Sequence, residues 1–588
     1  MDGHRLHRGR RLPGVAHLNG WRAQSIAVAL AVAAAAPFLL AGLGGAPFDD
    51  PGEGMHAEIA RELMQHPSLP LTLGGVAYVD KPPLFYVLLA SAFHLFGPGE
   101  GPARLIAALA ALVAIGATAW LGARLLDGRA GVVAGLALGT SLGFFVYGRY
   151  VRPETLFVAA IALGFALLLI GVREERRVLA AAGLVAFALA ALAKDPLGAL
   201  APPLAVGLAL ALTGRAQPVG RWLPWPGIVL AVLVAFGWWI AAERATPGFT
   251  WYTVIDNHVL NVVRARNFPD EDVPLGPGEF LAVALFGIVP WVVPALVVVA
   301  RLVRRRAWRD PTETVWVALA LWTLGVLGLT AATPFRLPHY GLPAYPAIAL
   351  LAARGWSELG ARRLAILHAV LFAMLAVACV LAWSSDGSTF FAEVMGATDV
   401  ATRKSGVAGV PPPIPPWFAL RPLIGATALA LAGGAAALTV TAIVRARTAA
   451  AYATIATLLF VLPSAAGALG LVAAHRAVKG LAEEIGRRAG PADVLALEGP
   501  LENAGALEWY SGRRPVIVEG RQSVLGFGAT QADAPDVFWD AEKLEREWAG
   551  PRRIWLVTGR PAERSVVARL PEPTIAAAGG GRRLYVNR

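Results

Sequence analysis

The sequence predicts a polytopic α-helical membrane protein of about 13 transmembrane helices, followed by a small C-terminal α/β domain. Of the 588 residues, 56% are hydrophobic and only 16% are charged, well below the roughly 25% charged residues of soluble domains. Apolar runs of about 18 residues or more, long enough to cross a bilayer core, recur along most of the chain. From about residue 475 the composition becomes that of a soluble protein.

Arginine clusters set the number and direction of the spans. The first apolar run follows a basic N-terminus and is too long for a signal peptide, so we interpret it as an uncleaved span with the N-terminus inside. The loops that then face the cytoplasm carry most of the arginines, as the positive-inside rule expects. The predicted spans lie near 24–46, 103–122, 131–147, 155–171, 177–192, 197–213, 226–243, 281–301, 313–332, 341–354, 364–384, 421–444 and 451–473.

The stretch Pro82–Phe96 is apolar but short, and it opens with two prolines. Counting it as a span would place every later arginine cluster outside, so we expect a surface or re-entrant helix. The chain then divides into a basic N-terminus (1–23), a membrane domain (24–474) with an outer first loop (47–102), and an outer soluble domain (475–588).

The soluble part alternates between two kinds of segment. Helix-like stretches at Leu501–Tyr510 and Ala541–Trp548 separate the β-like runs, which predicts a small α/β domain. A proline-rich segment near 411–416 reads as a stiff linker before the last two spans. The β-like runs are Val494–Leu497, Val516–Val518, Ile554–Thr558 and Leu584–Val586.

The formal net charge of +12 does not require a nucleic-acid partner, because cytoplasmic loops account for it. The chain has 47 arginines and five lysines, so each lysine is informative. A single cysteine, Cys379, lies in an apolar run and excludes a disulfide within the chain.

The first outer loop places several carboxylates just before a helix, among them Asp50 and Glu53. A partly desolvated carboxylate at a membrane surface can act as a general base or organise a cation. Capping is the alternative, because Asp50, Pro51 and Glu53 also have the spacing of a helix N-terminus with a capping box.

Four further outer segments carry polar side chains, so five loops offer such groups at one membrane level. A compact ammonium such as that of Lys81 suits a phosphate head group, although a lysine at the interface can also simply snorkel. The pattern predicts a site for an anionic lipid head group and a sugar. The segments hold Asp80 and Lys81; Arg149, Arg152 and Glu154; Lys194; Asp256, His258, Arg264 and Arg266; and Arg336, His339 and Tyr340.

At these residues the chain resembles the aminoarabinose transferase/protein O-mannosyltransferase group, membrane glycosyltransferases of the GT-C fold. The resemblance runs nearly end to end, and the tail around Glu508–Arg513 resembles the periplasmic domain of the aminoarabinose-transferase branch. The matching stretches are Glu53–Glu62, Tyr78–Tyr86, Arg149–Leu156, Ala193–Gly198, Ile255–Val263, Pro290-Trp291 and Arg336–Pro346.

The resemblance implies inverting transfer of a sugar from a polyprenyl-phosphate donor to lipid A, a protein or another envelope glycan. The reaction would take place at the outer face of a bacterial inner membrane, in contact with membrane lipids. The family's catalytic Asp, which directly precedes a Glu, falls here on Gly52. Asp50 or Glu53 then takes the role, or activity is lost; we favour Asp50, because Pro51-Gly52 can turn the chain back. The family's second acidic position falls on Glu154.

The family's phosphate-binding lysine falls on Lys81 and its tyrosine on Tyr340. A further basic residue is Arg264 or Arg266, between which the sequence does not decide. Some relatives hold a divalent metal ion. The residues of this sequence that correspond to its ligands are Asp80 and His258. The other residues that we predict to bind substrate or phosphate are Arg149, Lys194, Arg336 and His339.

Two other functions compete with catalysis. A non-catalytic polyprenyl-phosphate binder or flippase-like transporter shares the phosphate site but needs no base, and Gly52 is its best support. A structural membrane protein whose outer domain binds a partner is the second, and the gathering of charged residues in five loops argues against it.

Overall fold

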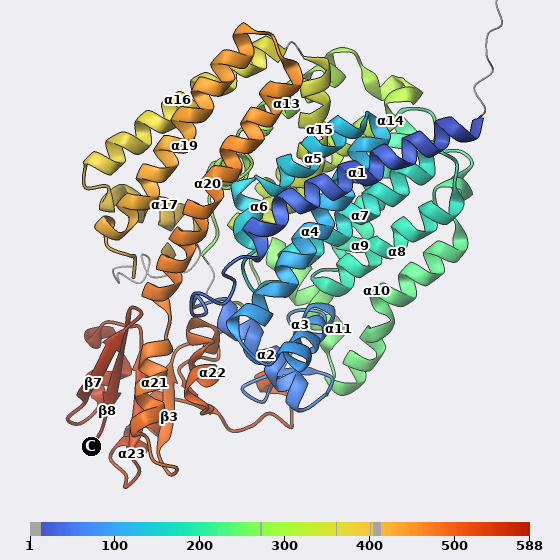
Figure 1. Ribbon diagram of the computed structural model, residues 1–588. Coiled ribbons are helices and arrows are strands. Elements are labelled where there is room, and N and C mark those ends of the chain that lie inside the picture. Colours follow the sequence, from blue (N-terminus) through green and yellow to red (C-terminus); the bar gives the residue numbers. More distant parts are fainter. Residues whose placement is uncertain (1–12, 271–272, 360, 400–401, 404–412) are drawn as a thin grey trace, which may run out of the picture.

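A computed structural model describes residues 13–270, 273–359, 361–399, 402–403 and 413–588. A helical bundle carries a small sheet domain at one end, called the domain-bearing end below (Figure 1). Residues 1–12 of the predicted basic N-terminus and Pro411-Pro412 of the predicted linker lie outside the described residues.

The bundle's helices follow the predicted apolar runs, so the polytopic helical fold is confirmed. Among the described residues, eight helices are long and apolar enough to cross a membrane. The bundle comprises α1 (Pro13–Leu40), α4 (Glu100–Leu125), α5 (Gly128–Gly139), α6 (Leu142–Tyr147), α7 (Glu154–Arg173), α8 (Arg177–Ala193), α9 (Leu197–Leu212), α10 (Trp225–Ala245), α12 (Pro277–Phe286), α13 (Val292–Arg304), α14 (Thr314–Ala332), α15 (Tyr345–Glu358), α16 (Ala361–Ser384), α19 (Trp417–Ile443) and α20 (Arg447–Arg476).

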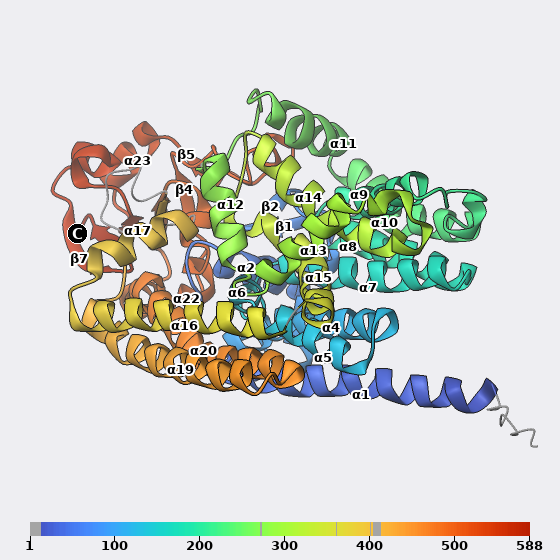
Figure 2. The same cartoon turned by 90° about the horizontal axis from the view of Figure 1, so that it is seen from above.

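Each of the thirteen predicted spans falls on a helix or on a helix pair interrupted by a break. The span predicted near 131–147 divides into α5 and α6, and the span near 281–301 divides into α12 and α13 around Gly287 and Pro290. Helices α16, α19 and α20 pack together beside the rest of the bundle (Figure 2). The number of spans stays a prediction.

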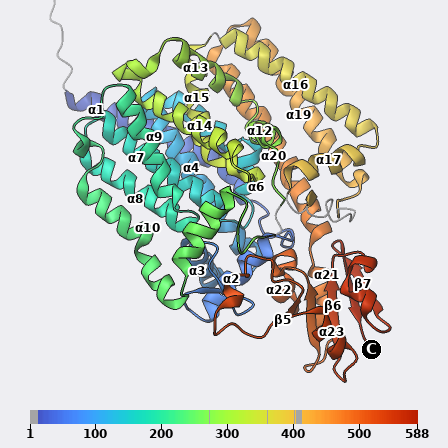
Figure 3. The same ribbon diagram turned by 180° about the vertical axis from the view of Figure 1, so that it is seen from behind.

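The first loop forms a compact layer at the domain-bearing end. It contains α2 (Glu53–Gln65), the hairpin of β1 (Leu71–Leu73) and β2 (Val76–Tyr78), and α3 (Leu84–Phe96). Helix α3 has 13 residues, about 20 Å at 1.5 Å per residue, which is shorter than the apolar core of a bilayer. In Figures 1 and 3, α2 and α3 lie at the end of the bundle, beside the C-terminal domain.

The C-terminal domain is an α/β domain, as predicted. Its six-stranded sheet has the order β5-β4-β3-β6-β8-β7, in which β3 pairs in parallel with β4 and β6, while β8 pairs antiparallel with β6 and β7. The elements are α21 (Lys479–Arg488), β3 (Val494–Glu498), α22 (Leu507–Ser511), β4 (Val516–Val518), β5 (Phe538–Trp539), α23 (Ala541–Trp548), β6 (Ile554–Thr558), β7 (Thr574–Gly579) and β8 (Arg582–Val586).

The first loop and the C-terminal domain share one hydrophobic core. Buried residues of the loop, such as Phe48 and Ile59, belong to the same cluster as Leu507 and Trp555 of the domain. The loop and the domain approach each other closely where a Cβ at Gly54 would lie 2.3 Å from the backbone nitrogen of Ala506. The domain is therefore packed onto the first loop and fixes the position of α2.

Candidate active site

Glu154, the first residue of α7, is the centre of a group of charged residues at the domain-bearing end. It is buried, and its Oε1 lies 3.3 Å from Lys194 Nζ and 3.2 Å from His339 Nε2. Its Oε2 lies 3.4 Å from Arg152 Nε. The ends of α7 and α8 and the 3-10 helix Pro338–Ala344 thus converge on one carboxylate.

Lys81 and Asp80 join this group from the loop between β2 and α3. The two side chains form an ion pair, and the charges of Glu154 and Asp195 also act on Lys81. Although burial opposes ionisation of both partners, Lys81 holds the pKa of Asp80 below its usual value, and Asp80 raises the pKa of Lys81. Lys81, Arg152 and Lys194 thus face Asp80 and Glu154, and these five residues, called the charge cluster below, carry a surplus positive charge.

Aromatic rings flank the charge cluster on one side. The Lys194 ammonium lies 5.1 Å from the centroid of the Tyr340 ring, and the His339 ring packs edge-on against Tyr340 at 4.9 Å. Burial lowers the pKa of His339 well below its usual value. The imidazole is therefore neutral, so it donates Nε2–H to Glu154 and keeps a lone pair on Nδ1.

His258 makes two hydrogen bonds that leave it no lone pair. Its Nδ1 lies 2.6 Å from the Thr253 carbonyl oxygen and its Nε2 3.2 Å from Asp195 Oδ2. The Asp195 hydrogen bond raises the pKa of His258, which fits an imidazolium that donates through both nitrogens. With Asp80 paired to Lys81, the predicted ligands Asp80 and His258 do not fit a metal ion as they lie, and no step below depends on one.

The structure distinguishes the two arginines between which the sequence did not decide. Arg266 pairs with Asp256 and Asp270, and the charge of Asp80 acts on it. Arg264 is exposed and has a positive φ of 57°. Arg266 is therefore the one beside the charge cluster.

Arg149 and Arg336, both predicted to bind substrate, cap helix ends. Arg149 donates to the carbonyl oxygens of Phe38, Leu39 and Ala41 at the end of α1. Arg336 donates to Leu275 and to carbonyl groups at the end of α14. Their guanidinium groups satisfy backbone acceptors that the helix ends leave open.

Asp50 connects the first loop to the C-terminal domain. Its Oδ2 accepts from the Val478 backbone N–H and its Oδ1 from the Ala506 backbone N–H, each at 3.1 Å. The capping interpretation is wrong, since α2 begins after Gly52 and has no side-chain cap. Burial raises the pKa of Asp50. Its catalytic role stays a prediction.

Glu53 and Asp49 are also held by several partners. Glu53 accepts from Arg104 Nε at 2.8 Å and from the Val151 backbone N–H at 3.0 Å. Asp49 pairs with Arg476 and accepts from the Tyr150 hydroxyl at 2.9 Å. Both carboxylates hold the loop in place, and the role of Glu53 in catalysis stays a prediction.

One residue that sequence reasoning missed lies beside the charge cluster. His56 of α2 is buried, and the charges of Arg152, Glu154 and Lys81 act on it. Its Nδ1 lies 2.8 Å from the Tyr86 hydroxyl oxygen. A histidine on an apolar helix face gives no signal in the sequence that separates it from a core residue.

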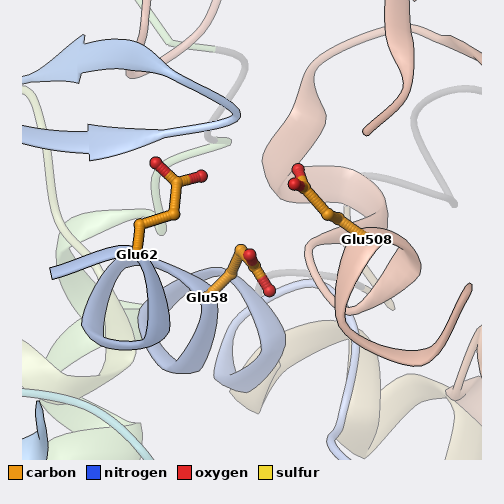
Figure 4. Close-up of side chains that lie close together, drawn as sticks. All are labelled: Glu58, Glu62 and Glu508. Atoms are coloured by element: carbon orange, nitrogen blue, oxygen red, sulfur yellow. The ribbon is translucent and has the colours of Figure 1, made fainter. Parts of the chain in front are cut away.

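Three other carboxylates gather between α2 and α22. Glu58, Glu62 and Glu508 are buried and offer oxygen atoms within 4.8 Å of one another, and Figure 4 shows them across the gap between the two helices. Arg61 pairs with Glu58, and Arg514 pairs with Glu62 and Glu508. Burial raises the pKa of Glu58 to about 8 and also raises that of Glu508.

Comparisons with known sequences agree with the predicted resemblance. Residues 80–240 match the family described as dolichyl-phosphate-mannose-protein mannosyltransferase. The chain is 25% identical over 313 residues to an undecaprenyl phosphate-alpha-4-amino-4-deoxy-L-arabinose arabinosyl transferase of Edwardsiella ictaluri (strain 93-146), covering 52% of this chain and 54% of that protein. An uncharacterized protein of Aquifex aeolicus (strain VF5) is also 25% identical, over 52% of this chain and 58% of its own length. The matches thus span little more than half of these relatives.

The fold is shared with a solved structure over nearly the whole chain. ArnT from Cupriavidus metallidurans, bound to undecaprenyl phosphate, superposes with a TM-score of 0.76 at 21% identity, covering 95% of this chain and 98% of that one. Its apo state gives a TM-score of 0.73. The GT-C arrangement expected from the motifs is thereby confirmed. The chain is thus a membrane protein that shares its fold with the Cupriavidus ArnT structure and is similar in sequence to an arabinosyl transferase.

Proposed function

We propose that this protein transfers a sugar from a polyprenyl-phosphate donor to an acceptor at the outer face of a bacterial inner membrane, with inversion at the anomeric carbon. The observation that carries the proposal is the charge cluster at the domain-bearing end. Its three cations outnumber its two carboxylates, and three separate segments of the chain contribute to it. Such a surplus binds a phosphate group.

The lysines fit the head group of a lipid carrier in particular. Lys81 and Lys194 have compact ammonium groups that act as point charges on a phosphate, and Tyr340 lies beside Lys194. The Edwardsiella relative is named for a substrate with an undecaprenyl phosphate carrier, and the ArnT structure holds undecaprenyl phosphate. Both names support a polyprenyl phosphate as the donor's carrier.

Glu154 organises this site in our proposal. Lys194, Arg152 and His339 all contact it, so the carboxylate fixes the cations that would hold the phosphate. Asp50 and Glu53 hold the first loop, which carries Lys81, in place. A sugar linked to the bound phosphate would then be close to α2 and to Tyr340.

The experiment is a comparison of envelope lipids and glycoproteins by mass spectrometry, in cells with and without the gene. We expect one sugar modification that depends on the gene and returns with the wild-type chain but not with Lys81→Ala. Lys543→Ala is the matched control, because Lys543 lies in the C-terminal domain and pairs with the exposed Asp536. Identical envelopes with and without the gene would contradict the transferase proposal.

A non-catalytic carrier-lipid binder is the second candidate. The observation that favours it is the absence of a side chain at Gly52, together with the structural bonds of Asp50 and Glu53. Such a protein would bind undecaprenyl phosphate but leave the envelope without a gene-dependent sugar.

A further inference from the structure

His56 lies in the N-terminal turn of α2, where the charges of the charge cluster act on it. A Cβ at Gly52 would lie 2.8 Å from the Tyr150 hydroxyl oxygen, so a larger residue there would displace Tyr150. His56 lies four residues further along α2, about one helical turn, and is 3% exposed.

A chain of hydrogen bonds fixes which nitrogen of His56 carries the proton. The Tyr86 hydroxyl donates to the Tyr78 hydroxyl at 3.2 Å, so its oxygen can only accept from His56 Nδ1 at 2.8 Å. Nδ1 is therefore protonated and Nε2 has the lone pair. Within the described part of the chain, Nε2 has no hydrogen-bond partner.

The surroundings keep this imidazole neutral. Burial, followed by the charge of Arg152, lowers the pKa of His56 to about 3. Lys81 acts in the same direction, whereas Glu154 and Asp80 oppose it. A neutral imidazole with an open lone pair, beside a cluster that binds phosphate, can accept a proton.

We propose that His56 Nε2 accepts the proton of the acceptor hydroxyl group during sugar transfer, an inference that rests on the function proposed above. The acceptor oxygen forms a bond to the anomeric carbon, and the bond from that carbon to the phosphate oxygen breaks. The electron pair leaves with the polyprenyl phosphate, and the hydroxyl proton goes to Nε2. The imidazolium then releases this proton to water.

Donor binding prepares His56 for this step. A phosphate bound to Lys81, Arg152 and Lys194 offsets the positive charges that oppose imidazolium formation, and Glu154 then favours the charged ring. The base is therefore weak in the empty site and stronger when the donor is present. Tyr86 holds the ring in one orientation throughout.

The experiment supplies the purified full-length chain with polyprenyl-phosphate sugars that have been extracted from the source membranes. It measures how fast the chain consumes them. Release of undecaprenyl phosphate is followed by mass spectrometry, so the acceptor need not be known if extracted membrane lipids and proteins are supplied. His56→Asn keeps an amide N–H for Tyr86 but removes the acceptor at Nε2, and His56→Gln places an amide there that cannot take a proton. His94→Asn, at an exposed position on α3, is the control.

We expect both His56 variants to lower turnover by about 10²–10⁴-fold. Their affinity for undecaprenyl phosphate should stay within about twofold of the wild type, and their melting temperature within a few degrees. Wild-type turnover in either folded variant would overturn the role of His56 and leave the transferase intact. Loss of binding and of stability in both variants would make His56 structural. No donor consumption by the wild-type chain would overturn the transferase function and this inference with it.

Discussion

Lys81 and Lys194 belong to the same charge cluster, although they lie more than 100 residues apart in the sequence. Their compact, strongly hydrated ammonium groups determine what the site binds. Lys81 contacts Asp80, and Lys194 contacts Glu154. Each pair leaves donor hydrogens on the ammonium, because an ammonium has three. A phosphate oxygen can therefore bind without displacing either carboxylate.

The first prediction concerns the contribution of Lys81 to the protein's affinity for the carrier lipid. We expect Lys81→Ala to weaken undecaprenyl phosphate binding by about 1.5–3 kcal/mol, the contribution of one charged hydrogen bond. Lys81→Arg should restore only part of it, because a planar guanidinium is wider than an ammonium. Titration of the purified protein with undecaprenyl phosphate measures this, and an unchanged Kd in Lys81→Ala would remove Lys81 from the site.

The second prediction separates a structural Asp50 from a catalytic one. Asn can accept only through one oxygen, so Asp50→Asn leaves the backbone N–H of Val478 or Ala506 unpaired. We expect a loss of about 1–3 kcal/mol of stability, measured by thermal unfolding, with turnover per folded molecule retained. A stable Asp50→Asn protein without activity would instead give Asp50 the catalytic role.

Among the residues that the sequence singled out, those at helix ends are brought together by the structure. Lys81, Glu154, Lys194, His339 and Tyr340 meet because each stands next to the end of a helix on the same side of the bundle. The partners of Asp50 are more than 400 residues away in another domain. No spacing rule within the first loop could reveal them.

At the scale of elements, the contact between α2 and α22 depends on protonation. Glu58, Glu62 and Glu508 are buried together with two arginines, which leaves one carboxylate without a compensating charge. Burial raises the pKa of Glu58 to about 8 from an ordinary 4.5. The folded protein thus binds this proton more tightly than the unfolded chain does.

The third prediction follows from the sign of that shift. The stabilising effect is complete below pH 4.5 and is lost progressively as the pH rises from there to about 8, so the melting temperature should fall between about pH 5 and pH 8 and level off above. Glu58→Gln should flatten this fall and exceed the wild type above pH 8. The exposed Glu542 provides the control variant Glu542→Gln. A pH-independent loss of stability in Glu58→Gln would contradict the assignment.

The fourth prediction concerns the close approach of α2 to the domain. A Cβ at Gly54 would lie 2.3 Å from the Ala506 nitrogen and 2.6 Å from its Cα, so backbone must move. We expect Gly54→Ala to loosen the docked domain, seen as faster protease cleavage near α21 and a lower melting temperature. Gly480→Ala, which meets nothing within 4 Å, should leave both unchanged.

Hydropathy predicts where the bundle's helices lie better than it predicts the breaks within them. Apolar length located the bundle's spans, and apolar β-like runs located β3, β4, β6 and β8. Strands β5 and β7 were missed, because β5 has only two residues and the Ala- and Gly-rich sequence of β7 lacks the residues that favour strands. The breaks between α5 and α6 and between α12 and α13 lie against each other, since the Gly143 backbone N–H donates to the Gly287 carbonyl oxygen at 2.9 Å.

For the whole molecule, the predicted inner loops meet one another at the end of the bundle opposite the charge cluster. Arg173 donates to the carbonyl oxygen of Arg124, and Arg215 donates to that of Pro311. Arg221 pairs with Glu175, and Arg354 with Glu313. The basic loops therefore share one side, as a single membrane orientation requires.

The last prediction is that orientation. The positive-inside rule places the arginine-rich loops in the cytoplasm, which puts the C-terminal domain and the charge cluster outside. The 13-residue α3 is too short to span, which agrees with the predicted odd number of crossings. A reporter that fluoresces only in the cytoplasm should be silent after Arg588 and bright when inserted in the loop at Arg306. A bright signal after Arg588 would show that the protein has the opposite orientation in the membrane. The site would then face the cytoplasm, and the donor would have to be bound from that side.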